Sequence, residues 1–138
     1  MKYKKLPNPS YQDSQERLYP GSNIKTITFQ VTEDCCLKCT YCYQHNKSKL
    51  KMTFDVAKQF INDILNNKIE DFTTDNTQGI IVEFIGGEPL LEIDLIQQIW
   101  EYLVFNLIDL DHPWQYHLRG SICSNGILYF SEKVQNFF

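Results

Sequence analysis

The chain has 138 residues, of which 43% are hydrophobic and 22% are charged, a balance typical of one globular domain. Thirteen Lys and Arg residues against 17 Asp and Glu residues give a net charge of −4, so the positive surface that nucleic-acid partners require is missing. No stretch approaches the about 20 consecutive apolar residues of a transmembrane helix, and no apolar run follows the N-terminal lysines as in a secretory signal. We therefore expect no membrane partner, no nucleic-acid partner and a cytoplasmic location.

Two segments divide the chain. Residues 1–23 are mostly polar and contain Pro7, Pro9 and the turn signal Pro20-Gly21. This composition predicts an irregular N-terminal arm. The patterned sequence of residues 24–138 predicts the folded domain.

The first repeating unit starts with a strand. Residues 24–31 form a β-branched run that is typical of a strand, and a polar, cysteine-rich loop follows over residues 32–51. Thr53 is a suitable helix N-cap. Beyond it, apolar residues recur every four positions at Val56, Phe60 and Ile64. This spacing predicts an amphipathic helix over residues 54–68.

Two further units repeat the plan. Residues 79–85 are almost continuously apolar, as expected for a strand covered on both faces, and a helix is predicted over about residues 92–108. Residues 116–123 suggest a third strand, and residues 124–126 a turn. A third helix is predicted to begin at Ser131-Glu132.

Strand, loop and helix in succession predict an α/β fold with a parallel sheet. A closed eight-unit barrel takes about 250 residues, so residues 24–138 supply about three units of a partial TIM-like barrel. We expect the chain to end short of a closed barrel. An open sheet edge and an exposed inner face would then favour a second chain that completes the barrel.

The cysteines carry the strongest chemical signal. Four of the five fall within eight residues, namely Cys35, Cys36, Cys39 and Cys42. A disulfide-stapled domain would spread its cysteines along the chain. Cys35, Cys39 and Cys42 have the spacing C-x3-C-x2-C. Three thiolates leave one iron of a four-iron cluster open to another ligand, so this triad predicts an iron–sulfur site.

Other interpretations of these cysteines remain. A structural zinc site could use all four clustered cysteines, although adjacent Cys35 and Cys36 make poor joint ligands. A redox pair would require one cysteine pair at the start of a helix rather than in a polar loop. Cys123 is expected to be a small buried strand residue.

Two more loops follow predicted strands. Gly86-Gly87-Glu88-Pro89 ends the second strand, and Ser124-Asn125-Gly126 ends the third. Ligands of parallel α/β folds bind at the carboxyl ends of the strands, so these loops and the cysteine loop are predicted to share one face. The structural alternatives are a plain strand-to-helix turn with a solvated Glu88 carboxylate, and a plain turn at Ser124 to Gly126.

The segments FQVTEDCCLKCTYCYQ, FIGGEPLL and CSNGILY resemble the radical S-adenosylmethionine (SAM) enzymes. They are most similar to the peptide- and protein-modifying branch, which often carries a C-terminal auxiliary-cluster domain of the SPASM type. The resemblance runs from about Ile24 to the C-terminus and implies the N-terminal half of a (β/α)6 core. It implies that Cys35, Cys39 and Cys42 ligate three irons of a 4Fe-4S cluster whose fourth iron is chelated by SAM.

The resemblance also implies roles for other residues. Tyr41 would lie beside the adenine, and Gly86, Gly87 and Glu88 would meet the methionine amino group, with a carboxylate suited to an ammonium. Ser124 and Asn125 would lie near the cofactor. Cys36 stands where the family often has Asn, and we assign it no role. No second cysteine cluster follows for an auxiliary cluster.

The implied activity is that of an oxidoreductase-like maturase. An external electron donor would reduce the cluster, and cleavage of SAM would give a 5′-deoxyadenosyl radical that modifies a peptide or protein substrate. The alternative is a non-catalytic iron–sulfur-binding fragment that needs a partner chain or a C-terminal half.

Overall fold

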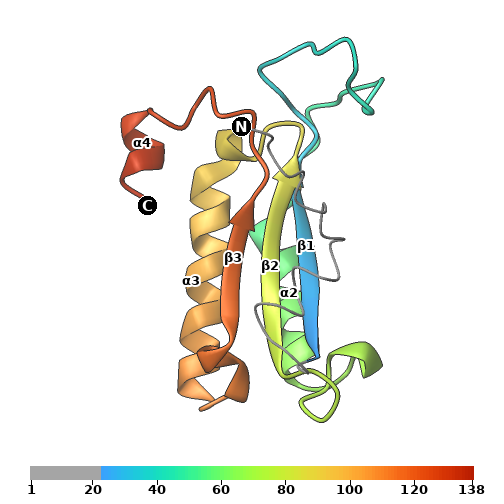
Figure 1. The fold of residues 1–138 in the computed structure, drawn as a ribbon, viewed down its shortest axis with the longest axis vertical. Coiled ribbons are helices and arrows are strands. Elements are labelled where there is room, and N and C mark those ends of the chain that lie inside the picture. Colours follow the sequence, from blue (N-terminus) through green and yellow to red (C-terminus); the bar gives the residue numbers. More distant parts are fainter. Residues whose placement is uncertain (1–22) are drawn as a thin grey trace, which may run out of the picture.

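The computed structural model describes residues 23–138, so the predicted N-terminal arm lies outside the described residues except for Asn23. Three strands, β1 (Ile24–Thr32), β2 (Gly79–Gly86) and β3 (Leu118–Ile122), form a parallel sheet in the order β1-β2-β3 (Figure 1). Ile24 pairs with Gly79, and Ile80 pairs with Leu118. The predicted α/β class with a parallel sheet is confirmed, whereas the TIM-like barrel stays a prediction.

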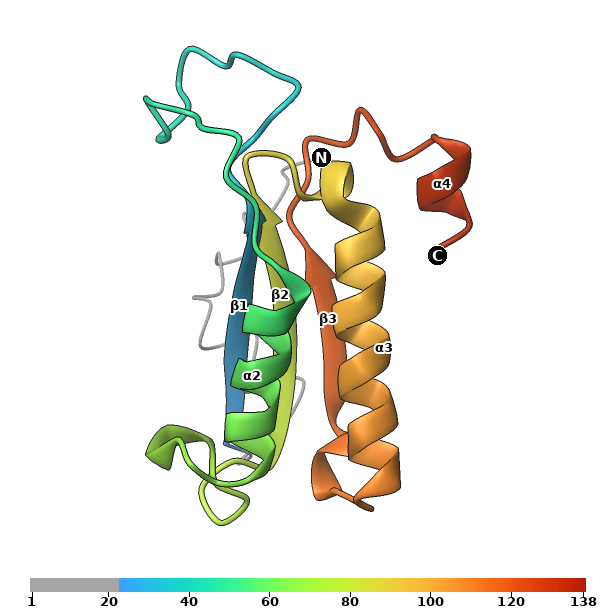
Figure 2. The same ribbon diagram turned by 180° about the vertical axis from the view of Figure 1, so that it is seen from behind.

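Two long helices connect the strands. These are α2 (Phe54–Leu65) and α3 (Ile93–Asp109), and both lie on the same face of the sheet (Figure 2). A short helix, α4 (Glu132–Gln135), follows Ser131 as predicted. The 3-10 segments are η1 (Glu70–Phe72), η2 (Pro89–Glu92) and η3 (Pro113–Tyr116).

The core lies between the sheet and these two helices. Phe29 of β1 stacks on Phe84 of β2 with ring centroids 5.9 Å apart. Buried side chains from both layers surround this pair, including Ile27, Val31, Ile80, Val82, Ile61, Ile96, Ile99, Leu103 and Leu107. Burying each such side chain contributes about 1.5–3 kcal/mol, so this layer holds the strand ends in place.

The face of β2 that points away from the two helices is less buried than predicted. Ile81, Glu83 and Ile85 are only half-buried there, so within residues 23–138 the strand is fully covered on one face rather than two. Glu83 is not bare, because its carboxylate accepts a hydrogen bond from the Thr28 hydroxyl at 3.1 Å. The continuous apolar run GIIVEFI indicated more cover than the two helices provide.

Helix α2 exists as predicted but differs in detail. Its buried side chains are Ala57, Ile61, Ile64 and Leu65. Val56 is 58% exposed. The helix face that packs on the sheet is therefore displaced by about one residue from the predicted face of Val56, Phe60 and Ile64. The helix ends at Leu65 because Asn67 adopts a left-handed conformation (φ 54°), which asparagine tolerates. Thr53 is the N-cap residue, yet its side chain makes no capping bond.

The third strand is shorter than predicted. It begins at Leu118 because η3 occupies the preceding residues. Within η3 the Trp114 side chain is buried, and its indole N–H donates to the Thr77 carbonyl at 2.7 Å. This bond ties η3 to the segment before β2, at the amino ends of the strands.

Candidate iron–sulfur site

Three loops meet at the carboxyl ends of the strands, as the sequence predicted. The cysteine loop (residues 33–51) leaves β1, the Gly86–Pro89 segment leaves β2, and the Ser124–Gly126 turn follows β3. Figure 1 shows all three at the same end of the sheet, with the cysteine loop projecting furthest. The fold therefore places the candidate ligands where parallel α/β proteins bind theirs.

Backbone bonds close the cysteine loop at its base. The Glu33 N–H donates to the Leu50 carbonyl at 2.9 Å, and the Met52 N–H donates to the Val31 carbonyl at 3.0 Å. Thr32 and Lys51 also form an isolated antiparallel bridge. The two ends of the loop are thus fixed side by side, and the cysteines lie between them.

The thiols differ in exposure. Cys35, Cys39 and Cys42 are half-buried, whereas Cys36 is exposed. The Cys42 N–H donates to the Cys39 carbonyl at 3.2 Å, so a tight turn links these two residues. The Leu37 N–H lies 3.4 Å from the Cys35 sulfur and donates to it. No helix begins at any of them, which disfavours the redox-pair interpretation.

Lys47 brings a positive charge to the three thiols. Its ammonium donates to the Leu37 carbonyl at 2.8 Å, inside the same loop. Loss of hydration lowers the pKa of Lys47, but a hydrogen bond to Cys35 and the charges of Cys35, Cys42 and Cys39 outweigh it and raise that pKa above its ordinary value. Lys47 also lines a hollow of about 320 Å³ together with Cys39, Cys42 and His45.

Sequence reasoning missed this role of Lys47. In sequence, Lys47, Lys49 and Lys51 form a short basic run, and most such runs are solvated loops. Of the three, Lys49 alone fits that description, because Lys51 forms an ion pair with Glu92 and Lys47 donates to the Leu37 carbonyl within the cysteine loop. The one signal in the sequence is the position of Lys47, five residues beyond the last cysteine of the triad.

The backbone of the segment from Gly86 to Glu88 contacts the start of the cysteine loop. The Gly87 N–H donates to the Thr32 carbonyl at 3.0 Å, and the Glu88 N–H donates to the Asp34 carbonyl at 2.8 Å. A Cβ atom at Gly86 would lie 2.6 Å from the Thr32 carbonyl oxygen. Glycine is required here because the two backbones touch.

Glu88 is buried rather than solvated, which makes the solvated alternative wrong. Its side chain is 0% exposed. Its carboxylate accepts hydrogen bonds from the Leu90 N–H at 3.0 Å, the Ser124 hydroxyl at 2.8 Å and the Asn125 N–H at 2.8 Å. The structure thus joins the segment after β2 to the turn after β3, two regions that the sequence placed at one face.

Asn125 extends from that turn toward the cysteine loop. Its side-chain amide nitrogen lies 3.5 Å from the Cys36 sulfur and 3.9 Å from the Cys35 sulfur. Ser124, Asn125 and Glu88 therefore form one contact group with the first cysteines. Tyr41 is not part of it, because its side chain is 89% exposed. Cys123, predicted to be buried, is exposed, as are Arg119 and Ser121 at alternate positions of β3 before it.

The donor set fits a cluster by its chemistry. Three cysteines on one anchored loop supply the thiolates that iron–sulfur clusters take, and Lys47 offsets part of their charge. Within residues 23–138, however, no three Cys, His, Asp or Glu side chains converge on a common point for a metal ion. The four-cysteine zinc site is therefore not assembled either.

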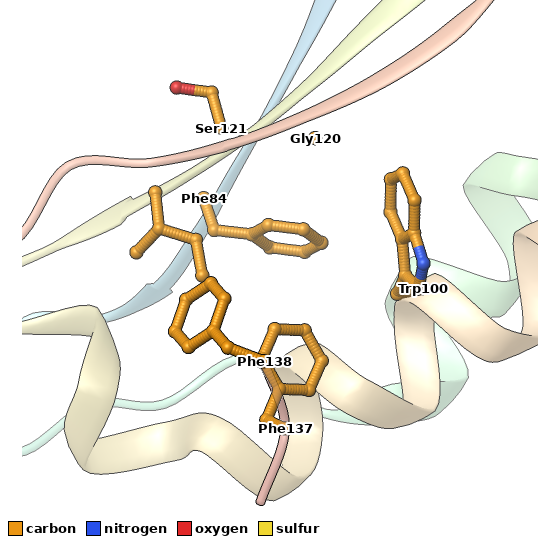
Figure 3. Close-up of a pocket in the computed structure, with 7 residues that line it drawn as sticks. Phe84, Trp100, Gly120, Ser121, Phe137 and Phe138 are labelled. Atoms are coloured by element: carbon orange, nitrogen blue, oxygen red, sulfur yellow. The ribbon is translucent and has the colours of Figure 1, made fainter. Parts of the chain in front are cut away.

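A separate apolar pocket lies beside β3. It has a volume of about 360 Å³ and is lined mainly by Phe84, Trp100, Phe137 and Phe138. Figure 3 shows the aromatic rings facing the pocket and the Ser121 hydroxyl pointing away from it. None of the predicted site residues lines this pocket.

Comparison with known proteins agrees with the site. The sequence matches the 4Fe-4S single cluster domain family over residues 20–116. The chain belongs to this family. It is 40% identical over 112 residues to an uncharacterised protein of Methanocaldococcus jannaschii, covering 81% of this chain and 35% of that protein. It is 25% identical over 111 residues to the radical SAM cyclopropyl synthase TigE of Paramaledivibacter caminithermalis, covering 67% of this chain and 22% of that enzyme.

These matches support membership of the radical SAM superfamily, as the sequence motifs implied. They favour an iron–sulfur site over zinc. The chain spans only about a third and a fifth of the lengths of the two curated relatives. In the described part of the chain, no helix has both the length and the apolar character needed to cross a membrane.

Proposed function

We propose that this chain carries the cluster-binding part of a radical SAM enzyme, with Cys35, Cys39 and Cys42 as the ligands of a 4Fe-4S cluster. The observation that carries the proposal is the anchored loop at the carboxyl end of β1, which presents these three half-buried thiols and holds the Lys47 ammonium inside the same loop. The family match and the similarity to TigE support it. With cluster and SAM bound, the chemistry supplied is reductive cleavage of SAM to a 5′-deoxyadenosyl radical.

The chain's own residues would hold this site in place. The backbone at Gly86 and Gly87 fixes the start of the cysteine loop through Thr32 and Asp34. Lys47 lowers the electrostatic cost of gathering three thiolates, because opposite charges close together stabilise each other. Tyr41, fully accessible next to Cys42, is free to pack against a flat ligand such as adenine.

We further propose that the substrate is a peptide or protein and that an external carrier supplies the electron. The similarity to TigE concerns 22% of that enzyme, so the substrate class comes from the sequence motifs. The half-buried face of β2 at Ile81, Glu83 and Ile85 offers polar and apolar contacts beneath the three loops. A bound peptide on that face would lie next to the cysteine loop.

A non-catalytic iron–sulfur module is the second candidate. The observation that favours it is that the three thiols do not converge in the described structure. A partner chain, or further strands of the same protein, would then be needed to assemble the site. The two candidates agree on the ligands and differ in the response to SAM.

The test is anaerobic reconstitution of the protein with iron and sulfide, followed by EPR of the reduced form with and without SAM. The enzyme hypothesis expects a cluster signal that changes when SAM is added. A cluster signal that ignores SAM supports the non-catalytic module. Zinc bound in place of iron contradicts both hypotheses.

The ligand assignment has a matched control. Cys35→Ala, Cys39→Ala and Cys42→Ala are each expected to lose the cluster signal, because each removes one of three ligands. Cys36→Ala, next to Cys35 and similarly reactive, is expected to keep it. Equal loss of iron in the Cys36 variant would contradict the assignment.

A further inference from the structure

The carboxylate of Glu88 is buried and therefore not accessible to a ligand. All three of its hydrogen bonds come from within the chain, from Leu90, Ser124 and Asn125, at 2.8–3.0 Å. A carboxylate has about four acceptor sites, so most of its capacity is used. Its 0% exposure leaves no path for direct contact with a cofactor ammonium.

These hydrogen bonds fix the turn after β3. The Ser124 hydroxyl donates to Glu88 and accepts from the Gly126 N–H at 2.9 Å. The oxygen of the Asn125 side chain accepts from the Ile127 N–H at 3.0 Å. With that oxygen engaged, the amide nitrogen of Asn125 faces the other way, toward Cys36 and Cys35.

We propose that Glu88 is a positioning residue, which holds the turn after β3 so that the Asn125 side-chain amide donates to the sulfurs at the start of the cysteine loop. Glu88 acts through Asn125 instead of binding the methionine amino group with its carboxylate. The part of the proposal that concerns a cluster rests on the proposed function, whereas the part that concerns the turn does not.

The consequence for a cluster follows from charge. Hydrogen bonds to ligand sulfurs set the reduction potential, because a donor stabilises the more negative, reduced form. Removing the Asn125 amide is therefore expected to lower the midpoint potential. Removing the Glu88 carboxylate has two opposed effects: loss of its negative charge raises the potential, whereas loss of the oriented Asn125 amide lowers it.

The first experiment needs no cluster. Hydrogen exchange of the Asn125 backbone N–H is measured by NMR in the metal-free, full-length protein. We expect Glu88→Gln to speed this exchange by about tenfold or more, because a buried hydrogen bond to a charged acceptor is lost. Glu101→Gln, which removes the same charge from an exposed position of α3, is expected to leave it unchanged.

The second experiment uses the reconstituted protein without SAM. The midpoint potential is determined by EPR-monitored titration for Glu88→Gln, Asn125→Ala and the double variant. We expect Asn125→Ala to lower the potential. We expect Glu88→Gln to shift the potential to a lower value in the protein that keeps Asn125 than the same substitution does in the Asn125→Ala background, where only the charge effect remains. Such non-additivity is the signature of one residue acting through another. A general loss of stability would not produce it.

The outcomes separate the two proposals. Unchanged exchange at Asn125 in Glu88→Gln, or additive shifts in the double variant, overturns the positioning role. Failure of the wild-type protein to form any cluster overturns the proposed function, and the exchange experiment then still decides whether Glu88 holds the turn.

Discussion

The backbone of Gly87 lies directly against the carbonyl group of Asp34. A Cβ atom at Gly87 would stand 2.3 Å from the Asp34 carbonyl oxygen, which already accepts the Glu88 N–H at 2.8 Å. Asp34 in turn accepts the Cys35 N–H through its carboxylate at 2.9 Å. The end of β2 thus contacts the residue that immediately precedes the first cysteine of the triad.

Gly87→Ala is therefore expected to push the cysteine loop away from β2. We expect a loss of about 1–3 kcal/mol in unfolding free energy, because a backbone must move to admit the methyl group. Limited proteolysis is expected to cut the loop faster. Gly120→Ala is the control, since its Cβ would lie 3.2 Å from the Trp100 ring, far from the loop. Equal acceleration of cleavage in both variants would argue against a specific contact.

Lys47→Gln is expected to lower the midpoint potential of a reconstituted cluster. Glutamine can still donate to the Leu37 carbonyl, but the positive charge beside the three thiols is lost, and the reduced state is then less favoured. Lys49→Gln removes the same charge from an exposed position of the loop. If both variants shift the potential equally, the effect is one of net charge rather than of the placement of Lys47.

His112 is expected to make stability depend on pH. Burial lowers its pKa below the usual value, and its Nδ1 accepts the Trp114 N–H at 3.2 Å, which requires a neutral ring. The unfolded chain therefore binds the proton first, so unfolding free energy falls as pH drops through about 6.5 and levels off below the folded-state pKa. Thermal unfolding from pH 8 to pH 5 measures this. His112→Asn, which keeps a capping oxygen, is expected to flatten the curve, and an unchanged slope would contradict the assignment.

Helix α3 offers a test of the core. Leu103 is buried between α3 and the sheet, whereas Phe105, two residues further, is 69% exposed. Leu103→Ala is expected to cost about 2–5 kcal/mol of unfolding free energy. Phe105→Ala is expected to change it by no more than about 0.5 kcal/mol. Denaturant unfolding of the two variants compares them directly, and a comparable loss in both would mean that the exposed face of α3 is covered.

The local pattern of apolar residues was enough to predict the strands and helices, but not which face of each element is buried. Helix α2 has two adjacent apolar stripes, one through Val56 and Phe60 and one through Ala57 and Ile61. Their spacing is identical, so periodicity alone could not choose between them. The choice depends on how α2 lies over the sheet, and that is a tertiary property. Ile61 packs inward, while Phe60 sits at the edge with its ring against Phe29 at 6.0 Å.

In the candidate site, too, local features could be predicted from the sequence and long-range contacts could not. The spacing of Cys35, Cys39 and Cys42 is a local signal and identified the loop at once. The burial of Glu88 is not local, because its partners Ser124 and Asn125 lie 36 and 37 residues further along the chain. A carboxylate next to two glycines looks available for a ligand until those distant donors are known.

The sheet order has a consequence for how the site is made. Because β1, β2 and β3 lie side by side in the order in which they are synthesised, each strand can dock on the one before it as it leaves the ribosome. The cysteine loop is synthesised directly after β1. Gly87 and Glu88, whose backbone N–H groups bond to the start of that loop, are synthesised only after β2, and Asn125 only after β3. During synthesis the cysteine thiols are therefore present before the contacts from Gly87, Glu88 and Asn125 can form. A cluster inserted after β3 has docked would meet a cysteine loop that already contacts the segments following both β2 and β3.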